Sequence, residues 1–319
     1  MKISVLVPVY GVEKYIARCA ESLFSQTYRD LEFVFVDDCT PDRSIAVLHE
    51  VMERWPQRAA QVRILRNGRN SGVGYVRQRL IDESTGDCIA FVDSDDYLPA
   101  RAIELLAAEM ERSGADIVDG AWQGVTQDGV SAVRPPCHER DASRYLALML
   151  CQNIVPHRMW GRLFRRSVFV ENGVRLVPGI DLAEDYTVMT RLMFYASRSV
   201  IDDPVYFYSE DNTASYTHVA SLRHLQSYLK ACRVVLDFFT VNDTAGRYRT
   251  PLQFGLVNAL RLVRRLGYGF APADRLLGYR PQGVFFRLMS ALFRGRCPYR
   301  VAEMLYLLAR RIYVLWLKM

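Results

Sequence analysis

The residue types best suited to chemistry lie in two short acidic clusters, Asp37-Asp38 and Asp93-Ser94-Asp95-Asp96. Each cluster comes directly after an apolar run, at residues 31–36 and 88–92. Alternating carboxylates on a tight turn can converge on a hard divalent cation, because Mg²⁺ and Mn²⁺ prefer oxygen ligands together with substrate phosphates. A solvated acidic loop is the alternative, and it is the commoner meaning of an isolated D-x-D. An EF-hand does not fit, because Tyr97 and Leu98 stand where a ligand and a turn-forming glycine are needed.

The turn after the first apolar run bears on how a nucleotide would bind. It reads Pro8-Val9-Tyr10-Gly11 and lacks the G-x-G-x-x-G pattern that lets a pyrophosphate lie on a helix start. The phosphate-binding pattern G-x-x-x-x-G-K-[ST] does not occur in the chain. These absences disfavour a dinucleotide oxidoreductase and a P-loop enzyme. A nucleotide would instead be held through acidic side chains and a metal ion.

Strands and helices alternate in the part of the chain that carries these residues. Short apolar runs predict strands at residues 3–10, 31–36, 62–65 and 88–92. Helical spacing of apolar residues predicts helices at residues 15–26, 44–55 and 73–84. This alternation is typical of an α/β fold with βαβ units and a mostly parallel sheet. Ligands bind such sheets beyond the carboxyl ends of the strands, which is where both acidic clusters fall.

The second half of the sequence is more helical. Residues 116–118 are predicted as a strand and residues 127–129 as a hairpin turn. Helices are expected at residues 140–151 and 184–196, and the second of these starts with Glu184-Asp185, which suits the positive end of a helix. After residue 221 the pattern is helical almost to the end, with breaks near Pro272, Pro281 and Pro298.

Length and composition fit an intracellular globular protein. A chain of 319 residues with 50% hydrophobic residues fits one large α/β domain with an appendage. The seven cysteines are scattered and never form C-x-x-C, so a reducing compartment is favoured over a disulfide framework or a zinc site. The first apolar run ends at Pro8 and is too short for a secretory signal. A cytoplasmic protein is therefore expected.

Basic residues are concentrated near the carboxyl terminus. Residues 255–319 contain 12 Lys and Arg but only Asp274 and Glu303, whereas the first 254 residues carry a net charge of −4. The last helical segment is interrupted by Arg310-Arg311, so a membrane span is not predicted. Basic groups beside an apolar face with Trp316 suit an interfacial helix on an anionic membrane; a helix packed on the protein is the alternative. Nucleic acid is disfavoured because no binding motif accompanies the charge.

An ordered set of motifs resembles the family 2 glycosyltransferases, which have the GT-A fold. The resemblance covers residues 3–215 and rests on Val7-Pro8-Val9-Tyr10, Val36-Asp37-Asp38, Asn70-Ser71-Gly72 with Arg77, Gly86-Asp87, Asp93-Ser94-Asp95-Asp96, Trp160-Gly161-Arg162, Glu184-Asp185 and Tyr206-Phe207-Tyr208. It implies a Rossmann-like, mostly parallel sheet flanked by helices, in an inverting enzyme of the bacterial polysaccharide and cell-envelope type. We therefore expect a catalytic domain at residues 1–215 and a basic helical extension at residues 216–319.

The resemblance also implies roles in binding the donor. Pro8, Val9 and Tyr10 would line the pocket for the base and ribose, and Asp38 would accept a hydrogen bond from a uracil ring nitrogen. Arg77 would lie near the phosphates. The structural alternatives are that Tyr10 simply packs and that Arg77 is a solvated helix residue.

The remaining implied roles concern metal binding and catalysis. Asp93 would hold the ribose or support the metal shell, and Asp95 would coordinate the Mn²⁺ or Mg²⁺ that bridges the diphosphate. Asp185 would be the general base, although acidic residues at a helix start ordinarily serve as caps. One departure is Arg162, where lysine is frequent in the family; it keeps the charge but not the geometry.

The expected reaction is the transfer of a sugar from a nucleotide sugar, with UDP favoured, to a hydroxyl of a glycan or lipid-linked acceptor. A carboxylate would take the hydroxyl proton while a metal offsets charge on the leaving diphosphate. The Q-x-x-R-W motif of processive synthases is absent, which favours single additions. The alternatives are a nucleotidyltransferase of similar fold and an inactive membrane-associated protein that binds glycans or nucleotides. The enzyme is expected at the inner face of the cell membrane.

Overall fold

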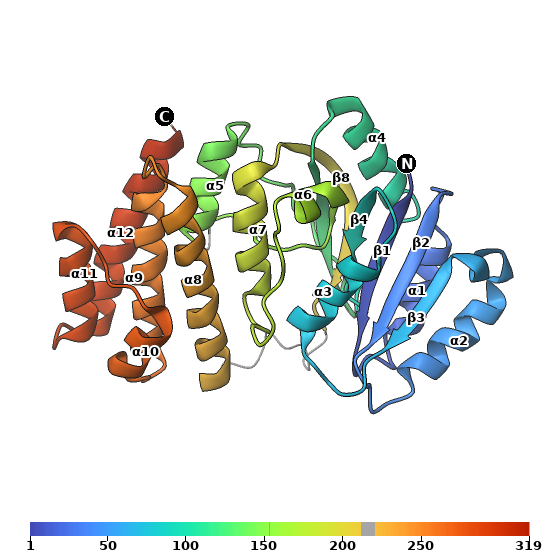
Figure 1. The fold of residues 1–319 in the computed structure, drawn as a ribbon, viewed down its shortest axis with the longest axis horizontal. Helices are drawn as coiled ribbons and strands as arrows, with labels where there is room; N and C mark the ends of the chain where they lie inside the picture. The colour runs from blue at the N-terminus through green and yellow to red at the C-terminus, as the bar shows by residue number, and fades with distance from the viewer. Residues whose placement is uncertain (153, 212–220, 319) are drawn as a thin grey trace. The chain divides into compact units, whose positions relative to one another are not determined.

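A computed structural model describes residues 1–152, 154–211 and 221–318, which divide into two compact units (Figure 1). The first unit comprises residues 1–138, 158–179 and 195–215, and the second comprises residues 139–157, 180–194 and 216–319. The predicted boundary at residues 215 and 216 lies outside the described residues, and that division stays a prediction. By compactness, residues 139–157 and 180–194 group with the carboxyl-terminal helices.

Among the described residues, the strands of the first unit form one mixed sheet in the order β3-β2-β1-β4-β7-β5-β6, with β8 paired to β5. The strands are β1 (Ile3–Val9), β2 (Leu31–Asp37), β3 (Val62–Arg66), β4 (Cys88–Phe91), β5 (Ile117–Thr126), β6 (Gly129–Val130), β7 (Arg162–Arg165) and β8 (Arg198–Ser209). Strands β3, β2, β1 and β4 run parallel, whereas β7 is antiparallel to both β4 and β5. The predicted α/β fold with a mostly parallel sheet and carboxyl-terminal helices is confirmed.

Helices cover the sheet of the first unit, and the sequence places their apolar residues on one side. They are α1 (Ile16–Phe24), α2 (Ser44–Arg54), α3 (Val73–Glu83), α4 (Ala102–Ser113) and α6 (Arg166–Glu171), with the short 3₁₀ helix η1 (Pro56–Gln61). The first helix buries Ile16, Cys19 and Leu23 at helical spacing. Phe24 meets the Phe33 ring of β2 edge-on at 5.3 Å between centroids. These contacts build a core between the sheet and the helices.

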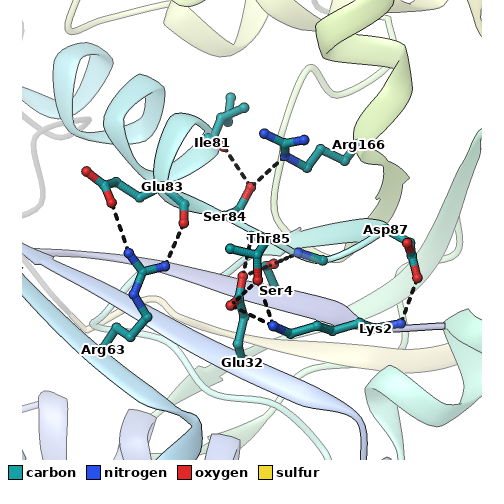
Figure 2. A network of polar contacts seen from close by, with 11 residues as sticks. Lys2, Ser4, Glu32, Arg63, Ile81, Glu83, Ser84, Thr85, Asp87 and Arg166 are labelled. Carbon is teal, nitrogen blue, oxygen red and sulfur yellow. Dashed lines mark hydrogen bonds and ion pairs between the residues drawn. The ribbon is translucent and has the colours of Figure 1, made fainter.

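A polar network joins the amino ends of β1, β2 and β4 (Figure 2). Glu32 accepts hydrogen bonds from the Ser4 hydroxyl at 2.5 Å and from the Thr85 amide at 2.6 Å, and it pairs with Lys2 at 3.1 Å. Burial would raise the pKa of Glu32, but these hydrogen bonds outweigh it and lower the pKa to about 2. Gly86 is required here, because an added Cβ would lie 2.6 Å from the Ser4 hydroxyl. The network holds the parallel strands together at the amino edge.

A buried ion cluster fixes β7 beside β5. Asp119 of β5 pairs with Arg158 at 2.9 Å, Arg162 at 3.0 Å and Arg198 at 3.2 Å. Burial would raise the pKa of Asp119, but the three guanidinium groups lower it well below its usual range. Arg162 also donates to the Arg158 carbonyl at 2.5 Å, a second bond that uses the fork of a guanidinium. Arginine at this position therefore has a structural explanation.

The second unit consists of helices. They are α5 (Ala142–Leu150), α7 (Glu184–Tyr195), α8 (Leu222–Asn242), α9 (Arg249–Arg265), α10 (Phe270–Leu277), α11 (Val284–Arg294) and α12 (Tyr299–Lys318). Helix α9 is central and packs against α5, α8, α10, α11 and α12 (Figure 1). Phe254 and Val257 of α9 share a buried cluster with Phe293 of α11 and Tyr306 of α12. Within the described ranges, no helix has both the length and the apolarity needed to cross a bilayer.

Candidate active site

Adjacent parallel strands bring the predicted donor-site residues to one edge of the sheet. Strand β1 lies between β2 and β4, so the segments that follow these three strands are neighbours. The Asp38 amide donates to the Val9 carbonyl at 3.0 Å, and the Val92 amide donates to the Leu6 carbonyl at 3.0 Å. The segments with Pro8, Asp38 and Asp93 therefore meet at the carboxyl edge, where α/β sheets bind ligands.

The segment after β1 exposes Tyr10 and buries Val9. The Val9 side chain is fully buried in the core, whereas Tyr10 is 48% exposed. Side chains of the 40–44 loop hold the following turn, because the Gly11 amide donates to Thr40 at 2.9 Å and the Val12 amide donates to Ser44 at 3.1 Å. Tyr10 is thus the side chain of this segment that is open to a flat ligand group, and the turn that carries it is fixed.

Asp38 orders the loop before α3. Its carboxylate accepts hydrogen bonds from Asn67 Nδ2 at 2.6 Å, from the Ser71 amide at 2.9 and 3.0 Å and from the Gly72 amide at 2.9 Å. Each carboxylate oxygen therefore already receives two bonds from the chain. Cys39, the next residue, has a φ of +58°, a left-handed conformation that costs about 1–2 kcal/mol for a residue with a Cβ. Such strain clusters at functional sites, so this turn is a candidate for binding.

Arg77 and Asp93 form an ion pair in which the arginine is almost fully buried. Arg77 Nη2 lies 2.6 Å from Asp93 Oδ1, and the side chains are 5% and 25% exposed. This pair joins α3 to the loop after β4. Arg77 is therefore not a solvated helix residue, and its charge offsets one carboxylate of the cluster.

Asp96 is a functional candidate that the sequence analysis did not single out. Its carboxylate accepts a hydrogen bond from the Tyr206 hydroxyl at 2.7 Å and another from the Ser209 amide at 2.7 Å. Tyr206 also accepts from the Asp93 amide at 3.1 Å, and the Ser209 hydroxyl donates to the Asp95 carbonyl at 2.6 Å. Burial and the charges of Asp95 and Asp93 raise the pKa of Asp96 well above its usual value. Asp96 is a positioning residue that holds the loop to β8, and the Tyr206-Phe207-Tyr208 motif was the available signal.

The donor set of this edge fits a divalent cation that a substrate shares. Asp93 and Asp95 are both partly exposed, and Asp93 is already paired with Arg77. No group of three or more His, Cys, Asp or Glu side chains with metal-site geometry occurs in the described part of the chain. Mg²⁺ and Mn²⁺ often bind proteins through one or two carboxylates together with substrate phosphates. The residues present therefore fit a cation completed by a diphosphate rather than a site made by protein alone.

Asp185 belongs to the second unit. It is the second residue of α7 and half-buried, and it follows the buried Glu184. Ala183, just before the helix, has a φ of +65°, and its carbonyl accepts from the Thr187 amide at 3.3 Å. Residues held in such strained conformations cluster at functional sites. The two acidic side chains also suit the positive end of the helix, so both interpretations fit the local geometry.

Residues 4–173 match the sequence model of the family Glycosyl transferase family 2. The "Uncharacterized glycosyltransferase EpsJ" of Bacillus subtilis is 31% identical over 263 residues, which span 78% of this chain and 73% of that protein. The poly(ribitol-phosphate) beta-N-acetylglucosaminyltransferase TarS of Staphylococcus aureus is 27% identical over 212 residues. That match covers 66% of this chain but only 35% of TarS.

Solved structures share the fold. A crystal structure of S. aureus TarS residues 1–349 in complex with UDP-GlcNAc aligns with a TM-score of 0.63 at 20% identity and covers 97% of this chain and 92% of that one. The mannosyltransferase PcManGT from Pyrobaculum calidifontis, in complex with GDP-Man and Mn²⁺, aligns with a TM-score of 0.54 at 19% identity. It covers 100% of this chain and 88% of that one. At these identities the alignments establish the fold.

Proposed function

Because this chain belongs to glycosyl transferase family 2, we propose that it moves a sugar from a UDP-sugar to a hydroxyl of a glycan or lipid-linked acceptor, with inversion. The family assignment makes the chain a glycosyltransferase and removes the nucleotidyltransferase alternative. A hexosyl or N-acetylhexosaminyl donor is supported by the relative TarS, which was crystallised with UDP-GlcNAc. The observation that carries the proposal is the meeting of Tyr10, Asp38 and the 93–96 loop at one edge of the sheet.

The donor would lie along this edge. Tyr10 is exposed and can stack on the base, while Pro8 and the Val9 backbone line the pocket. A uracil ring nitrogen that donates to Asp38 would have to share an oxygen that already accepts two hydrogen bonds. Arg77 lies beside Asp93 and would add positive charge near the phosphates.

Asp95 would be the metal ligand at this site, with Asp93 as support or as a ribose ligand. When bound, Mn²⁺ or Mg²⁺ would act as a Lewis acid for the negative charge that develops on the leaving diphosphate. This chain's contribution is to hold Asp95 in place. The Asp95 carbonyl accepts a hydrogen bond from the Ser209 hydroxyl, and the Tyr206 hydroxyl donates one to the adjacent Asp96. Because the loop is held in this way, the Asp95 carboxylate does not have to reorganise during the reaction.

Asp185 would take the proton from the acceptor hydroxyl. A hydroxyl has too high a pKa to attack unaided, so a carboxylate must accept its proton as the new bond forms. The assignment rests on the Glu184-Asp185 motif of the family and is supported by the strained residue before it. We place the enzyme in the cytoplasm, at the inner face of the cell membrane, where a lipid-linked acceptor is available.

Binding of nucleotide and metal tests the donor site directly. We expect UDP with Mn²⁺ to raise the melting temperature of the wild-type protein more than UDP alone, because a ligand that binds only the folded state stabilises it. In Asp95→Ala the additional effect of Mn²⁺ should disappear. Asp203→Ala, which removes an exposed carboxylate of β8, is the matched control and should behave as wild type. An Mn²⁺ effect of unchanged size in Asp95→Ala would show that the metal assignment is wrong.

A further inference from the structure

One face of α12 is apolar and exposed. We define the α12 face as seven residues that are each between 38% and 66% exposed: Val301, Met304, Leu305, Leu308, Ile312, Leu315 and Trp316. At 100° per residue they occupy an arc of about 120°. Ala302 and Tyr306 point the other way and are buried in the core of the second unit. The helix is thus anchored by one face while the other is largely exposed, with Trp316 stacked on the Tyr313 ring at 5.8 Å between centroids.

Helix α11, which packs beside α12, adds to this exposed apolar surface. Val284 is 78% exposed, Leu288 is 56% exposed, and both lie one turn apart on α11. Figure 1 shows α11 and α12 side by side in the second unit. Large exposed apolar patches are rare on soluble monomeric proteins and mark sites of interaction.

Exposed arginines border the α12 face. Arg300 and Arg311 are exposed and flank one side of the arc, and Arg287 is exposed on α11. None of the three forms an ion pair with an acidic side chain of the described chain. The two acidic residues after position 254 are already neutralised within the unit, Asp274 by Arg294 at 2.5 Å and Glu303 by Arg261 at 2.6 Å. The surface therefore offers apolar contact bordered by unneutralised cations.

This combination selects among the possible partners. A second copy of the chain would bring the same cationic surface, and two such surfaces repel each other. An acidic phospholipid bilayer supplies both of the missing complements, apolar acyl chains and anionic headgroups. A helix with Trp, Leu and Ile on one side and arginine beside them is typical of helices that lie in the membrane interface. A 20-residue helix is about 30 Å long, which is sufficient for several turns to insert side by side.

We propose that the α12 face docks the protein on an anionic lipid bilayer, with α12 lying in the plane of the interface and Arg300 and Arg311 against the headgroups. The inference rests on the proposed function only in that a lipid-linked acceptor gives such docking a purpose. Docking would restrict the search for the acceptor to the membrane surface. Since the anchored face of α12 belongs to the core, the helix docks without leaving the folded unit.

Binding of the full-length chain to vesicles tests the proposal. Co-sedimentation is measured with equimolar phosphatidylglycerol and phosphatidylcholine and with phosphatidylcholine alone. Three variants are compared: Ile312→Gln/Trp316→Gln removes apolar groups from the α12 face, and Arg300→Gln/Arg311→Gln removes the flanking charges. Val241→Gln replaces a 73% exposed apolar residue of α8 and is the matched control. All of these positions are exposed, so the melting temperatures should equal that of wild type.

We expect wild type and Val241→Gln to bind anionic vesicles at least about tenfold more tightly than neutral ones. The affinity for anionic vesicles should fall at least about tenfold in Ile312→Gln/Trp316→Gln. In Arg300→Gln/Arg311→Gln it should fall by up to about thirtyfold at low salt. Binding should weaken in about 0.5 M salt, since screening shortens electrostatic attraction. Asp95→Ala should bind vesicles as wild type does, so failure of the donor site and failure of docking are distinguishable.

Two results would overturn the proposal. One is vesicle binding that does not depend on the α12 face: the wild type fails to bind anionic vesicles at low salt, or Ile312→Gln/Trp316→Gln binds them as tightly as the wild type does. The other is a concentration-dependent dimer, measured by light scattering without lipid, that Ile312→Gln/Trp316→Gln abolishes. That second result would assign the face to a second copy of the chain.

Discussion

The carboxylates at the carboxyl edge differ in what the chain itself does with them. Asp38 uses both oxygens to order the loop before α3, and Asp96 uses both to hold β8. Asp95 is held through its backbone carbonyl, and Asp93 is paired with Arg77. Asp38 and Asp96 therefore support the loops of the site, and a substitution at either should disturb the loops that present Asp93 and Asp95.

The proposed base can be tested by a substitution that removes only its ability to take a proton. Asp185→Asn keeps the size of the side chain, so donor binding should change little while kcat falls by at least ~10²-fold, the usual contribution of a general base. The measurement is steady-state transfer together with calorimetry of UDP binding. Glu184→Gln is the matched control on the same helix turn. Near-normal turnover in Asp185→Asn with loss in Glu184→Gln would move the role to Glu184.

At the scale of elements, α12 packs on the second unit through one face and exposes apolar residues on the other. Tyr306 and Ala302 belong to the core with Phe254 and Phe293, while the opposite face is exposed. Arg310 also donates to the Gln152 carbonyl at 3.0 Å, so this arginine serves the fold and not a membrane. Removing the helix would therefore expose the core of the second unit as well as remove the α12 face.

The two faces of α12 should respond differently to truncation of a side chain. Tyr306→Ala empties a fully buried position and breaks the hydrogen bond to the Phe254 carbonyl, so we expect a loss of about 3 kcal/mol or more in the free energy of unfolding. Leu308→Ala, at a position 55% exposed, should cost less than about 0.5 kcal/mol. Denaturant unfolding measures both. Similar losses in the two variants would show that α12 does not pack as described.

At the scale of the whole molecule, the sheet of the first unit is clamped at one edge and open to ligands at the other. The clamp is the network of Ser4, Glu32 and Thr85 at the amino edge, and the loops of the candidate site lie at the carboxyl edge. An ion network on the side away from the ligand can stabilise the sheet without restricting the binding loops. Its contribution should depend on pH because Glu32 is its central acceptor.

The pH dependence follows from the lowered pKa of Glu32, which falls from 4.5 to about 2 on folding. A carboxyl with a lowered folded pKa stabilises the protein above its unfolded pKa, and this contribution is lost as the pH falls from about 4.5 towards 2. At neutral pH it is on the order of 3 kcal/mol. The difference in free energy of unfolding between wild type and Glu32→Gln should therefore be large at about pH 7 and smaller by roughly 2 kcal/mol at about pH 3. Glu50→Gln, an exposed carboxylate of α2, is the control; a difference that does not vary with pH would contradict this account.

The local pattern of the sequence was sufficient for the first half of the fold. The predicted helix at residues 44–55 is observed at Ser44–Arg54, and the helix at 73–84 is observed at Val73–Glu83. The reason is physical: apolar spacing determines which face of a helix or strand is buried, and parallel strands put their carboxyl ends on one edge. The predicted break in the helical pattern near Pro272 also follows from local sequence. A new helix, α10, begins at Phe270, and proline is tolerated in the first turn of a helix.

Tertiary structure alone decided what depends on partners distant in sequence. Asp96 is a support only because Tyr206 and Ser209 return to it from β8, more than 100 residues later. The strand at 116–118 extends to Thr126 since β8 pairs along its length, and β7 is held by the charge of Asp119. The sequence determined the chemistry available at the carboxyl edge. Only folding decided which acids accept hydrogen bonds from the protein itself and which face of α12 stays exposed. The reason is that burial depends on contacts and not on residue type.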